Sequence, residues 1–399
     1  MEIATTTLFA EPKCNCATMK QPSAAITSMP RSGIRVIMDL AMAMPDCIRL
    51  EVGEPNFATA PHIIEASHRA ALDGQTKYTD NSGIIGLREA IAEHREIQTG
   101  ANVQPEQVIV TSGAMGALFS TFTVLLDPGD EVIVFNPSWP NYQMQLQLIG
   151  ATPVMVATSA ANGYLPTVEQ LEAAETSRTK VVVVNTPSNP TGAMIDGDRL
   201  ASLVEFTRSI DAYLVADEVY EEIVFDKLHV PTASHDTDGR VVSIHSFSKT
   251  YAMTGWRVGY AVAPPDLASL IRKCQEPIIG CVNAPAQHAA LAALTGPQEM
   301  VEEMRNAYRE RRDIVLDLLE RAGVPAFKPE GAFYMWVDIS KSGRTDADFA
   351  VDLIKNHKVA VVPGTTFGAE NTGRVRITLA ADSNELEEGV RRLISEVER

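Results

Sequence analysis

The chain has 399 residues, 45% of them hydrophobic, and a formal net charge of −17 at pH 7. This length allows a large core divided between two or three domains, and so acidic a chain is a poor binder of nucleic acid or of an anionic membrane. Its apolar runs are far shorter than the roughly 20 residues of a membrane-spanning helix, and its N-terminus lacks the basic start and apolar core of a signal peptide.

The first 28 residues show no hydrophobic period and are predicted to form a flexible arm. Cys14 and Cys16 form a C-x-C pair in this arm, which could serve metal or redox chemistry or could lie in a solvated tail. Five cysteines spread over a long chain fit a reduced compartment better than a disulfide framework. We therefore expect a cytoplasmic protein that binds neither nucleic acid nor membrane.

An amphipathic helix is predicted over residues 31–44, followed by a strand that begins at Ile48 and breaks at Gly53. Seven apolar runs come next, and helical segments of suitable length separate most of them. These runs are residues 108–112, 131–136, 152–157, 180–185, 213–218, 241–247 and 259–264. They are continuous rather than alternating, so both faces of each strand should be buried. The pattern predicts an α/β fold with a mostly parallel seven-stranded sheet between helices.

The pattern changes after residue 284. A long helical stretch over 285–322 leads to FYMWVDI, a helix near 346–356, the strands VAVVP and RVRITLA, and a terminal helix. We predict a smaller α+β domain built from residues 29–56 and 285–399, beside a large domain of residues 57–284.

Polar residues gather where the predicted strands of the large sheet end. Ligands of open α/β sheets bind outside the carboxyl ends of the strands, so these residues should converge on one crevice. They are Gly113, Ala114, Met115, Trp139, Asn189, Asp217, Tyr220, Ser246, Ser248, Lys249 and Arg257.

The cations and hydroxyls of this set suit an anionic group. Ser246, Ser248 and Arg257 can donate hydrogen bonds to it. The N-terminus of the helix that follows Gly113 adds backbone N–H groups and a favourable dipole. Trp139 offers a face on which a flat ring can stack.

The remaining residues suit that ring. Asp217 could keep a basic ring nitrogen protonated, and Asn189 and Tyr220 could bind a phenolate-like oxygen. Lys249 carries an amine that could condense with an aldehyde. Anion, ring nitrogen, ring oxygen and aldehyde together describe pyridoxal 5'-phosphate.

Each residue also has a simpler structural explanation. Lys249 could be a solvated cap, Asp217 a helix N-cap and Arg257 half of an ion pair. Trp139 could belong to the core, and the NPTG stretch could be only a turn. The structural explanations would all have to hold independently of one another. The order in which these residues follow one another along the chain would then be accidental, so we favour the cofactor site.

From about Pro30 to the C-terminus the chain resembles the class I/II aminotransferases, which are fold type I pyridoxal-phosphate enzymes. The motifs that carry the resemblance are SNPTG, ADEVY, SFSKTYAMTGWRVGY, PEGAFY and VRIT. The resemblance implies that Asn189 and Tyr220 bind the ring oxygen and that Asp217 pairs with the ring nitrogen. It also implies that Lys249 bonds to the cofactor and then acts as the base.

The resemblance further implies a homodimer with shared active sites. Arg376 of VRIT would bind the substrate α-carboxylate, with a backbone contact from Gly53, and Tyr78 would reach the partner's phosphate. The simpler alternatives are a sheet-edge arginine, a turn glycine and an ordinary surface tyrosine.

Two positions bear on the substrate. Bacterial aspartate enzymes of this family carry a lysine and a hydroxyl residue where this chain has Met115 and Gly33. Neither side chain can bind a carboxylate, so we expect a neutral or apolar amino acid as donor and 2-oxoglutarate or pyruvate as acceptor. Arg35 is an alternative contact for an acidic side chain, or a solvated helix residue.

The predicted function is transamination by ping-pong chemistry. A β-lyase or a cyclising synthase could use the same lysine and aspartate. A pyridoxal-phosphate-sensing regulator would need a DNA-binding module, for which the N-terminal arm has no room. No G-x-G-x-x-G follows a predicted strand, which argues against a nicotinamide dehydrogenase.

Overall fold

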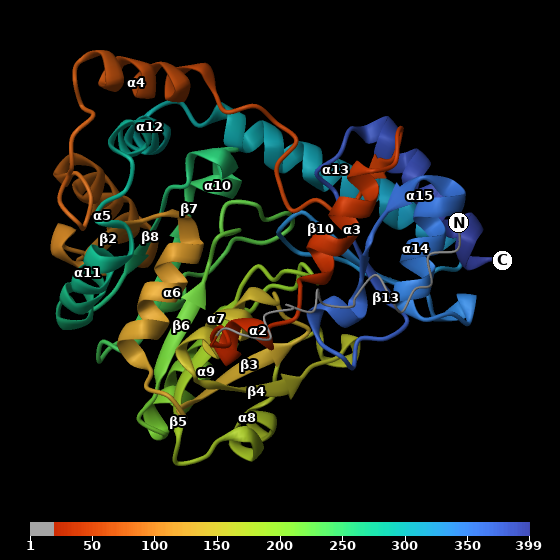
Figure 1. Cartoon of the computed structure of the whole chain (residues 1–399), viewed down its shortest axis with the longest axis horizontal. Helices are drawn as coiled ribbons and strands as arrows, with labels where there is room; N and C mark the ends of the chain where they lie inside the picture. The colour runs from red at the N-terminus through yellow and green to blue at the C-terminus, as the bar shows by residue number, and fades with distance from the viewer. Residues whose placement is uncertain (1–19) are drawn as a thin grey trace.

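A computed structural model describes residues 20–399, and a seven-stranded sheet forms the centre of its larger part (Figure 1). The strands lie in the order β2 (Val108–Thr111), β8 (Gly259–Val262), β7 (Val241–Ser246), β6 (Tyr213–Asp217), β5 (Thr179–Asn185), β3 (Glu131–Asn136) and β4 (Thr152–Ala157). β8 runs antiparallel to both its neighbours, and the other neighbouring pairs are parallel. The predicted mostly parallel seven-stranded sheet is therefore confirmed.

Helices cover both faces of this sheet, which explains why its strands are continuously apolar. On one face Val215, Val242 and Ile244 pack with α6 (Gly113–Leu125), α7 (Asn141–Ile149) and α11 (Pro265–Ile279). On the other face Leu214 and Ala216 pack with α8 (Val168–Ala174) and α9 (Gly197–Ser209). At the β2 and β8 end of the sheet, the helices packed on this second face are α4 (Pro61–Leu72), α5 (Ile85–Thr99) and α12 (Ala284–Thr295).

A second core lies beside the large sheet, where the red helix of residues 33–42 meets the blue C-terminal elements in Figure 1. Its antiparallel sheet has the order β12 (Val362–Pro363), β13 (Arg374–Thr378), β10 (Tyr334–Asp338) and β9 (Ala326–Phe327). Its helices are α3 (Gly33–Met42), α13 (Glu299–Arg321), α14 (Asp346–His357) and α15 (Ser383–Val397), and β1 (Ile48–Arg49) pairs with β11 (Val359–Ala360). The assignment of residues to two domains stays a prediction.

Four expectations about single elements need correction. The strand expected at VAVVP is divided into β11 and β12, which belong to two different sheets. The helix expected over 31–44 spans Gly33–Met42. The helical stretch over 285–322 is two helices, because Gly296 and Pro297 separate α12 from α13. The strand expected from residue 48 to Gly53 ends at Arg49, because the carbonyl oxygens of Leu50 and Glu51 accept hydrogen bonds from Thr378 and Arg376 instead of continuing the ladder.

The predicted flexible arm lies mostly outside the described residues, and so do Cys14 and Cys16. The part that is described contains α2 (Ala24–Thr27), which contacts α7 because Gln147 donates to the Ala25 carbonyl oxygen at 2.9 Å. No helix within residues 20–399 is long and apolar enough to cross a membrane.

Candidate active site

The carboxyl ends of the central strands bring the predicted polar residues together. Asn185 ends β5 opposite Asp217, which ends β6. The Asn185 amide donates to the Asp217 carbonyl oxygen at 2.9 Å and accepts from the Asn189 backbone N–H at 2.8 Å. Asn185 therefore fixes the SNPTG loop against the end of β6. We did not predict a role for Asn185 from the sequence, although it is the last residue of the run KVVVVN.

Asp217 is buried and has a buried partner. The Tyr142 hydroxyl donates to Asp217 Oδ2 at 2.5 Å. Burial raises the pKa of Asp217 to about 6, and the hydrogen bond from Tyr142 opposes this shift. A carboxylate that is costly to ionise alone is well suited to a cationic partner. Tyr142 was not among the predicted site residues, although it lies in the same PSWPNY segment as Trp139.

Lys249 lies in α10 (Phe247–Thr250), a single turn that follows β7. The Ser246 hydroxyl oxygen caps this turn by accepting from the Ser248 backbone N–H at 3.1 Å. The Lys249 amine donates to the Gly53 carbonyl oxygen at 2.6 Å. Burial lowers the pKa of Lys249 to about 8, so a fraction of its amine is uncharged near neutral pH and can accept a proton.

Arg376 is a buried cation on β13, 1% exposed. Its guanidinium donates to Asn189 Oδ1 at 3.0 Å and to the Glu51 carbonyl oxygen at 2.6 Å, and lies 4.2 Å from the centre of the Tyr334 ring. Within residues 20–399 it forms no ion pair with a carboxylate, and its Nε has no hydrogen-bond partner. Such a group is ready for the carboxylate of a ligand.

Tyr220 and Tyr334 complete this part of the site. Their hydroxyl oxygens lie 3.0 Å apart and both side chains are buried. Burial raises the pKa of Tyr220 well above its usual range, so Tyr220 stays a neutral donor. A side chain at Gly53 would approach the Tyr334 hydroxyl to 2.8 Å, which explains the glycine. Tyr334 is the last residue of the PEGAFY motif and was not itself predicted to be a site residue.

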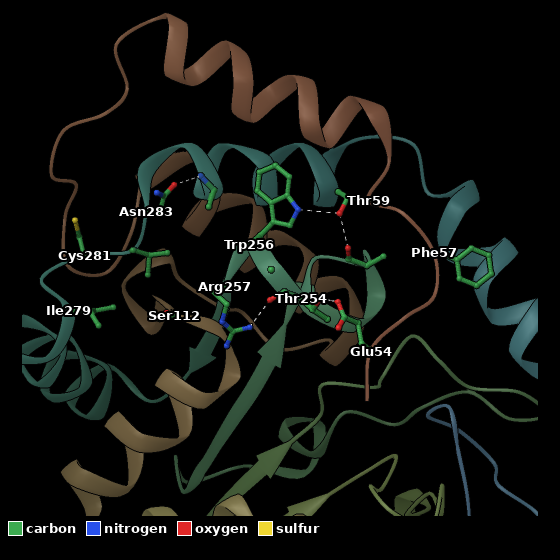
Figure 2. A pocket seen from close by; sticks show the side chains of 14 residues that line it. Glu54, Phe57, Thr59, Ser112, Thr254, Trp256, Arg257, Ile279, Cys281 and Asn283 are labelled. Atoms are coloured by element: carbon green, nitrogen blue, oxygen red, sulfur yellow. Dashed lines mark hydrogen bonds between the residues drawn. The ribbon is translucent and has the colours of Figure 1, made fainter. Parts of the chain in front are cut away.

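A cavity of about 660 Å³ opens beside Arg257 (Figure 2). Its wall includes Ser112, which precedes α6, and Thr254, whose carbonyl oxygen accepts from Arg257 at 2.8 Å. A Cβ built on Gly113 would lie 2.6 Å from Arg257 Nη2, so glycine is needed where the guanidinium meets the first turn of α6. Positive φ at Gly113 (67°) and Arg257 (56°) sets this approach.

The remaining predicted residues are placed as follows. Ala114 and Met115 stand in the first turn of α6, and the Met115 sulfur lies 3.4 Å from the Asn141 amide nitrogen. Trp139 is half-buried with its ring edge-on to Tyr142, at 5.6 Å between centroids. Tyr78 is 95% exposed and is not brought to the cluster within its own chain.

Gly33 and Arg35, from which we predicted the substrate preference, lie on α3. A Cβ on Gly33 would clash with the Thr366 hydroxyl at 2.2 Å, so the glycine allows α3 to approach that threonine. Arg35 is exposed, and its guanidinium lies 3.5 Å from the Met38 sulfur.

These groups fit an anionic, ring-shaped cofactor that carries an aldehyde. Arg257 and the α6 N-terminus offer an anion site in which a Cβ would fill the space, and within residues 20–399 Arg257 forms no ion pair. Asp217 and Lys249 supply a buried carboxylate and a buried amine of lowered pKa. The fold and this set of residues define a fold type I enzyme of the pyridoxal-phosphate-dependent class.

The chain belongs to the family of class I and II aminotransferases, whose family model matches residues 45–393. It is 39% identical over 364 residues to an aspartate aminotransferase from Geobacillus stearothermophilus, covering 89% of this chain and 92% of that protein.

Solved structures agree with this assignment. An aspartate aminotransferase from Thermus thermophilus with maleate matches with a TM-score of 0.91 at 36% identity, covering 95% of this chain and 100% of that one. An aromatic aminotransferase from Pyrococcus horikoshii OT3 matches with a TM-score of 0.85 at 36% identity, covering 90% and 98%. The protein is an aminotransferase. The names of its relatives include aspartate and aromatic enzymes, so they leave our expectation of a donor other than aspartate unconfirmed.

Proposed function

We propose that the protein binds pyridoxal 5'-phosphate and moves the amino group of a neutral or apolar α-amino acid to a 2-oxo acid in two half-reactions. The observation that carries this proposal is the convergence of Lys249, Asp217 and Arg376. Lys249 contacts the Gly53 carbonyl oxygen and Arg376 contacts that of Glu51, two residues earlier. Asn189 and Asn185 connect Arg376 to the end of the strand that carries Asp217.

The bound cofactor supplies an aldehyde that takes up an amino group and a conjugated ring that accepts the electron pair left at the substrate Cα. Arg257, Ser246, Ser248 and the N–H groups at Gly113 would hold its phosphate. Trp139 would lie against its ring, and Asn189 and Tyr220 would bind the ring oxygen as donors.

Asp217 would hold a proton on the ring nitrogen. Its burial makes an unpaired negative charge costly, so a pyridinium beside it favours the ionised carboxylate. Tyr142 would orient the carboxylate through its 2.5 Å hydrogen bond. This pair serves transamination because a charged ring is the better acceptor of electrons.

Lys249 would move the Cα proton. With a pKa lowered to about 8, its amine is basic enough to take a proton and is partly free of one near neutral pH. The same residue can return the proton to the cofactor side, so one base serves both half-reactions.

Arg376 would bind the α-carboxylate of every substrate by two parallel hydrogen bonds. The side chain of the substrate would meet Met115 and the region of Gly33, and neither of these two residues carries a cation; Arg35, two residues after Gly33, is exposed. A carboxylate buried without a partner costs several kcal/mol. We therefore infer a preference for uncharged side chains.

We also propose a homodimer with shared active sites. Tyr78 is 95% exposed, and Ile85 and Ile278 are 52% and 44% exposed. Large apolar side chains in solvent suggest a covered surface. Tyr78 of one subunit would then reach the phosphate site of the other.

The test is an amino-donor panel. Purified protein with pyridoxal phosphate, 2-oxoglutarate and single amino acids should form glutamate, most rapidly with neutral donors. Lys249→Ala should abolish this, whereas Lys273→Ala, an exposed lysine of α11, should not. Release of ammonia and an oxo acid without glutamate would instead support a β-lyase.

A further inference from the structure

Asp217 and the residue after it face opposite sides of the large sheet, because successive residues of a strand alternate. Asp217 lies on the side of α7, where Tyr142 contacts it. The side chain of Glu218 lies on the far side, 3.8 Å from His245 Nε2 of β7, and Glu218 is 1% exposed. A second buried carboxylate therefore stands directly behind the one that we assign to the ring nitrogen.

One oxygen atom of Glu218 accepts three hydrogen bonds. The donors are the Thr232 backbone N–H at 2.8 Å, the Thr232 hydroxyl at 2.9 Å and His229 Nε2 at 3.1 Å. All three end on Glu218 Oε1, whereas Oε2 has no hydrogen-bond partner within residues 20–399. The contacts of this side chain therefore depend on a single acceptor atom.

Glu218 has its own charged partner in this cluster. Burial opposes ionisation of Glu218, but the hydrogen bond from His229 and the charge of His229 outweigh it and keep the pKa of Glu218 below its usual range. Arg95, the cation of α5 on this side, is paired with Glu221 at 2.8 Å. Glu221 also lies 2.9 Å from His245 Nδ1. The bond between Glu218 and His229 is therefore separate from the pairing of Arg95.

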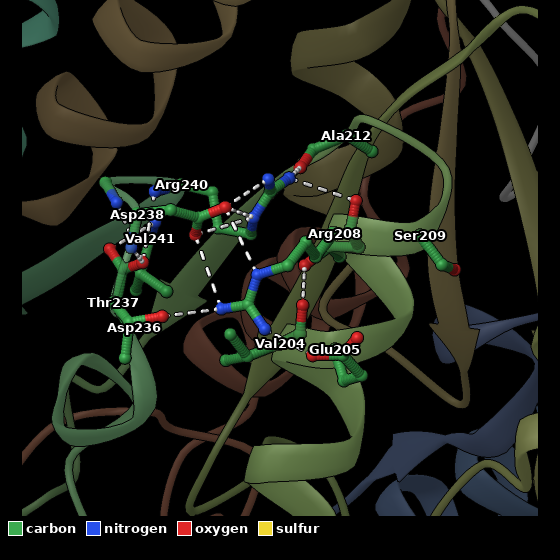
Figure 3. Close-up of polar contacts among 12 residues, drawn as sticks. Val204, Glu205, Arg208, Ser209, Ala212, Asp236, Thr237, Asp238, Arg240 and Val241 are labelled. Atoms are coloured by element: carbon green, nitrogen blue, oxygen red, sulfur yellow. Dashed lines mark hydrogen bonds and ion pairs between the residues drawn. The ribbon is translucent and has the colours of Figure 1, made fainter.

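The loop that joins β6 to β7 brings these donors to Glu218, and its far end is fixed by other polar contacts (Figure 3). Asp236 accepts from the backbone N–H groups of Gly239 and Val241, both at 3.0 Å. Arg208 of α9 donates to the Thr237 hydroxyl at 2.9 Å. Because these contacts already order the loop, little conformational entropy opposes the contacts that it makes with Glu218.

The position of Glu218 at the end of a strand gives its contacts a direction. The Glu218 backbone N–H donates to the Ile244 carbonyl oxygen at 2.9 Å, but β6 itself ends at Asp217, so the ladder does not continue beyond this point. A buried ion pair is a weak source of stability, because the cost of removing two charges from water offsets their attraction. Glu218 shares a peptide unit with Asp217, so holding its side chain limits how far that unit can turn.

We propose that Glu218 is a positioning residue for Asp217. It anchors the end of β6 from the far side of the sheet and keeps the Asp217 carboxylate buried beside Tyr142 and directed toward the ring nitrogen of the cofactor. This role rests on the proposed function, in which Asp217 holds a proton on that nitrogen. A carboxylate that is free to turn would take up water and would hold the proton in only part of the molecules.

Two substitutions of Glu218 separate the anchoring from the charge. Glu218→Gln removes the charge but keeps a carbonyl oxygen where Oε1 lies, so the three donors retain their acceptor. Glu218→Leu removes both the charge and the acceptor. Thr232→Val removes only the hydroxyl donor, and it is the variant to measure if Glu218→Leu does not fold.

The first measurement is made on the apoprotein by urea unfolding. The advantage of Asp217→Asn grows with pH and reaches a plateau near the pKa of the folded Asp217, about 6. Comparing Asp217→Asn with Asp217 in each background cancels a general loss of stability. Burial is the largest cause of the raised pKa of Asp217, so a loosened, hydrated carboxylate should have a lower one.

The plateau should therefore begin at least about one pH unit lower in Glu218→Leu than in Glu218→Gln. In Thr232→Val it should begin at a lower pH than in the wild type, by a smaller amount. An identical plateau in Glu218→Leu and Glu218→Gln, or an unchanged plateau in Thr232→Val, would overturn the proposal.

The second measurement uses the holoenzyme. Glu218→Leu should lower kcat at least about tenfold without raising KM for the amino donor, while Glu218→Gln should stay within about twofold of the wild type. An equal loss of kcat in both variants would overturn the proposal, because the charge and not the anchored oxygen would then matter. Borohydride should still fix the cofactor to Lys249 in every variant. If it does not do so in the wild type, the proposed function fails, whereas the apoprotein measurement still tests Glu218.

Discussion

Replacing Asp217 by asparagine should stabilise the cofactor-free protein while it removes activity. In the folded chain burial raises the pKa of Asp217 from 3.8 to about 6. Because the folded pKa is the higher one, this residue's contribution to stability is fully present below pH 3.8 and is lost as the pH rises through about 6. The free energy of unfolding falls by about 3 kcal/mol over the whole titration of Asp217. About 2 kcal/mol of this decrease occurs between about pH 4.5 and about pH 8.

Asparagine does not titrate, can still accept from Tyr142 and avoids this loss. Urea unfolding of the apoprotein should therefore show that Asp217→Asn gains about 2 kcal/mol over the wild type between these two pH values. The same substitution should lower kcat by several orders of magnitude, because an amide cannot keep the ring nitrogen protonated. Tyr142→Phe provides the control. Without the hydrogen bond from Tyr142 the pKa of Asp217 should rise further, so this variant should lose stability at a higher pH than the wild type does.

An advantage of Asp217→Asn that is the same at both pH values would refute this reasoning. Ionising the Asp217 carboxylate in the folded protein would then cost no free energy. Burial would in that case not explain why Asp217 needs a cationic partner.

Further predictions concern the substrate and the subunits. Arg376→Lys replaces a planar two-pronged contact by a point charge, so kcat/KM for every amino acid should fall by about 100-fold, with KM raised and kcat lowered; an effect confined to one donor in steady-state kinetics would contradict this. Met115→Lys should raise kcat/KM for aspartate relative to leucine by about 10- to 100-fold if the new contact contributes about 1.5–3 kcal/mol. A strong aspartate preference of the unmodified protein would show instead that another cation, Arg35 first, fills this role. Mixed Tyr78→Phe and Lys249→Ala subunits should form hybrids with one intact site and regain activity; if verified hybrids gain none, each site is built from one chain.

The sequence predicted the large sheet well because its strands are buried on both faces. Runs such as KVVVVN and VVSIH can be recognised as strands without knowing which strands lie beside them. Because ligands bind at the carboxyl ends of such strands, we could then predict that Asp217, Asn189 and Lys249 lie in one site. The strand expected before Gly53 was predicted too long, because the carbonyl oxygens of Leu50 and Glu51 bond to groups more than 300 residues away in the chain.

The supporting residues of the site were not predictable in the same way. Tyr142, Asn185 and Tyr334 each make a contact with a residue far away in the chain, and the hydrophobic pattern of a sequence does not show such contacts. The same holds for Arg95. Arg95 belongs to an amphipathic helix and looks like a surface arginine in the sequence, and only the packing of α5 against β7 and β8 shows it to be buried.

We propose that Lys249 is the amine that bonds to the cofactor, and this bond can be tested directly. Purified protein loaded with pyridoxal phosphate should be reduced with borohydride, digested and analysed by mass spectrometry. We expect a pyridoxyl group on the peptide that contains Lys249 and, within the limit of detection, on no other lysine. A protein left unmodified, or modified at a different lysine, would contradict it.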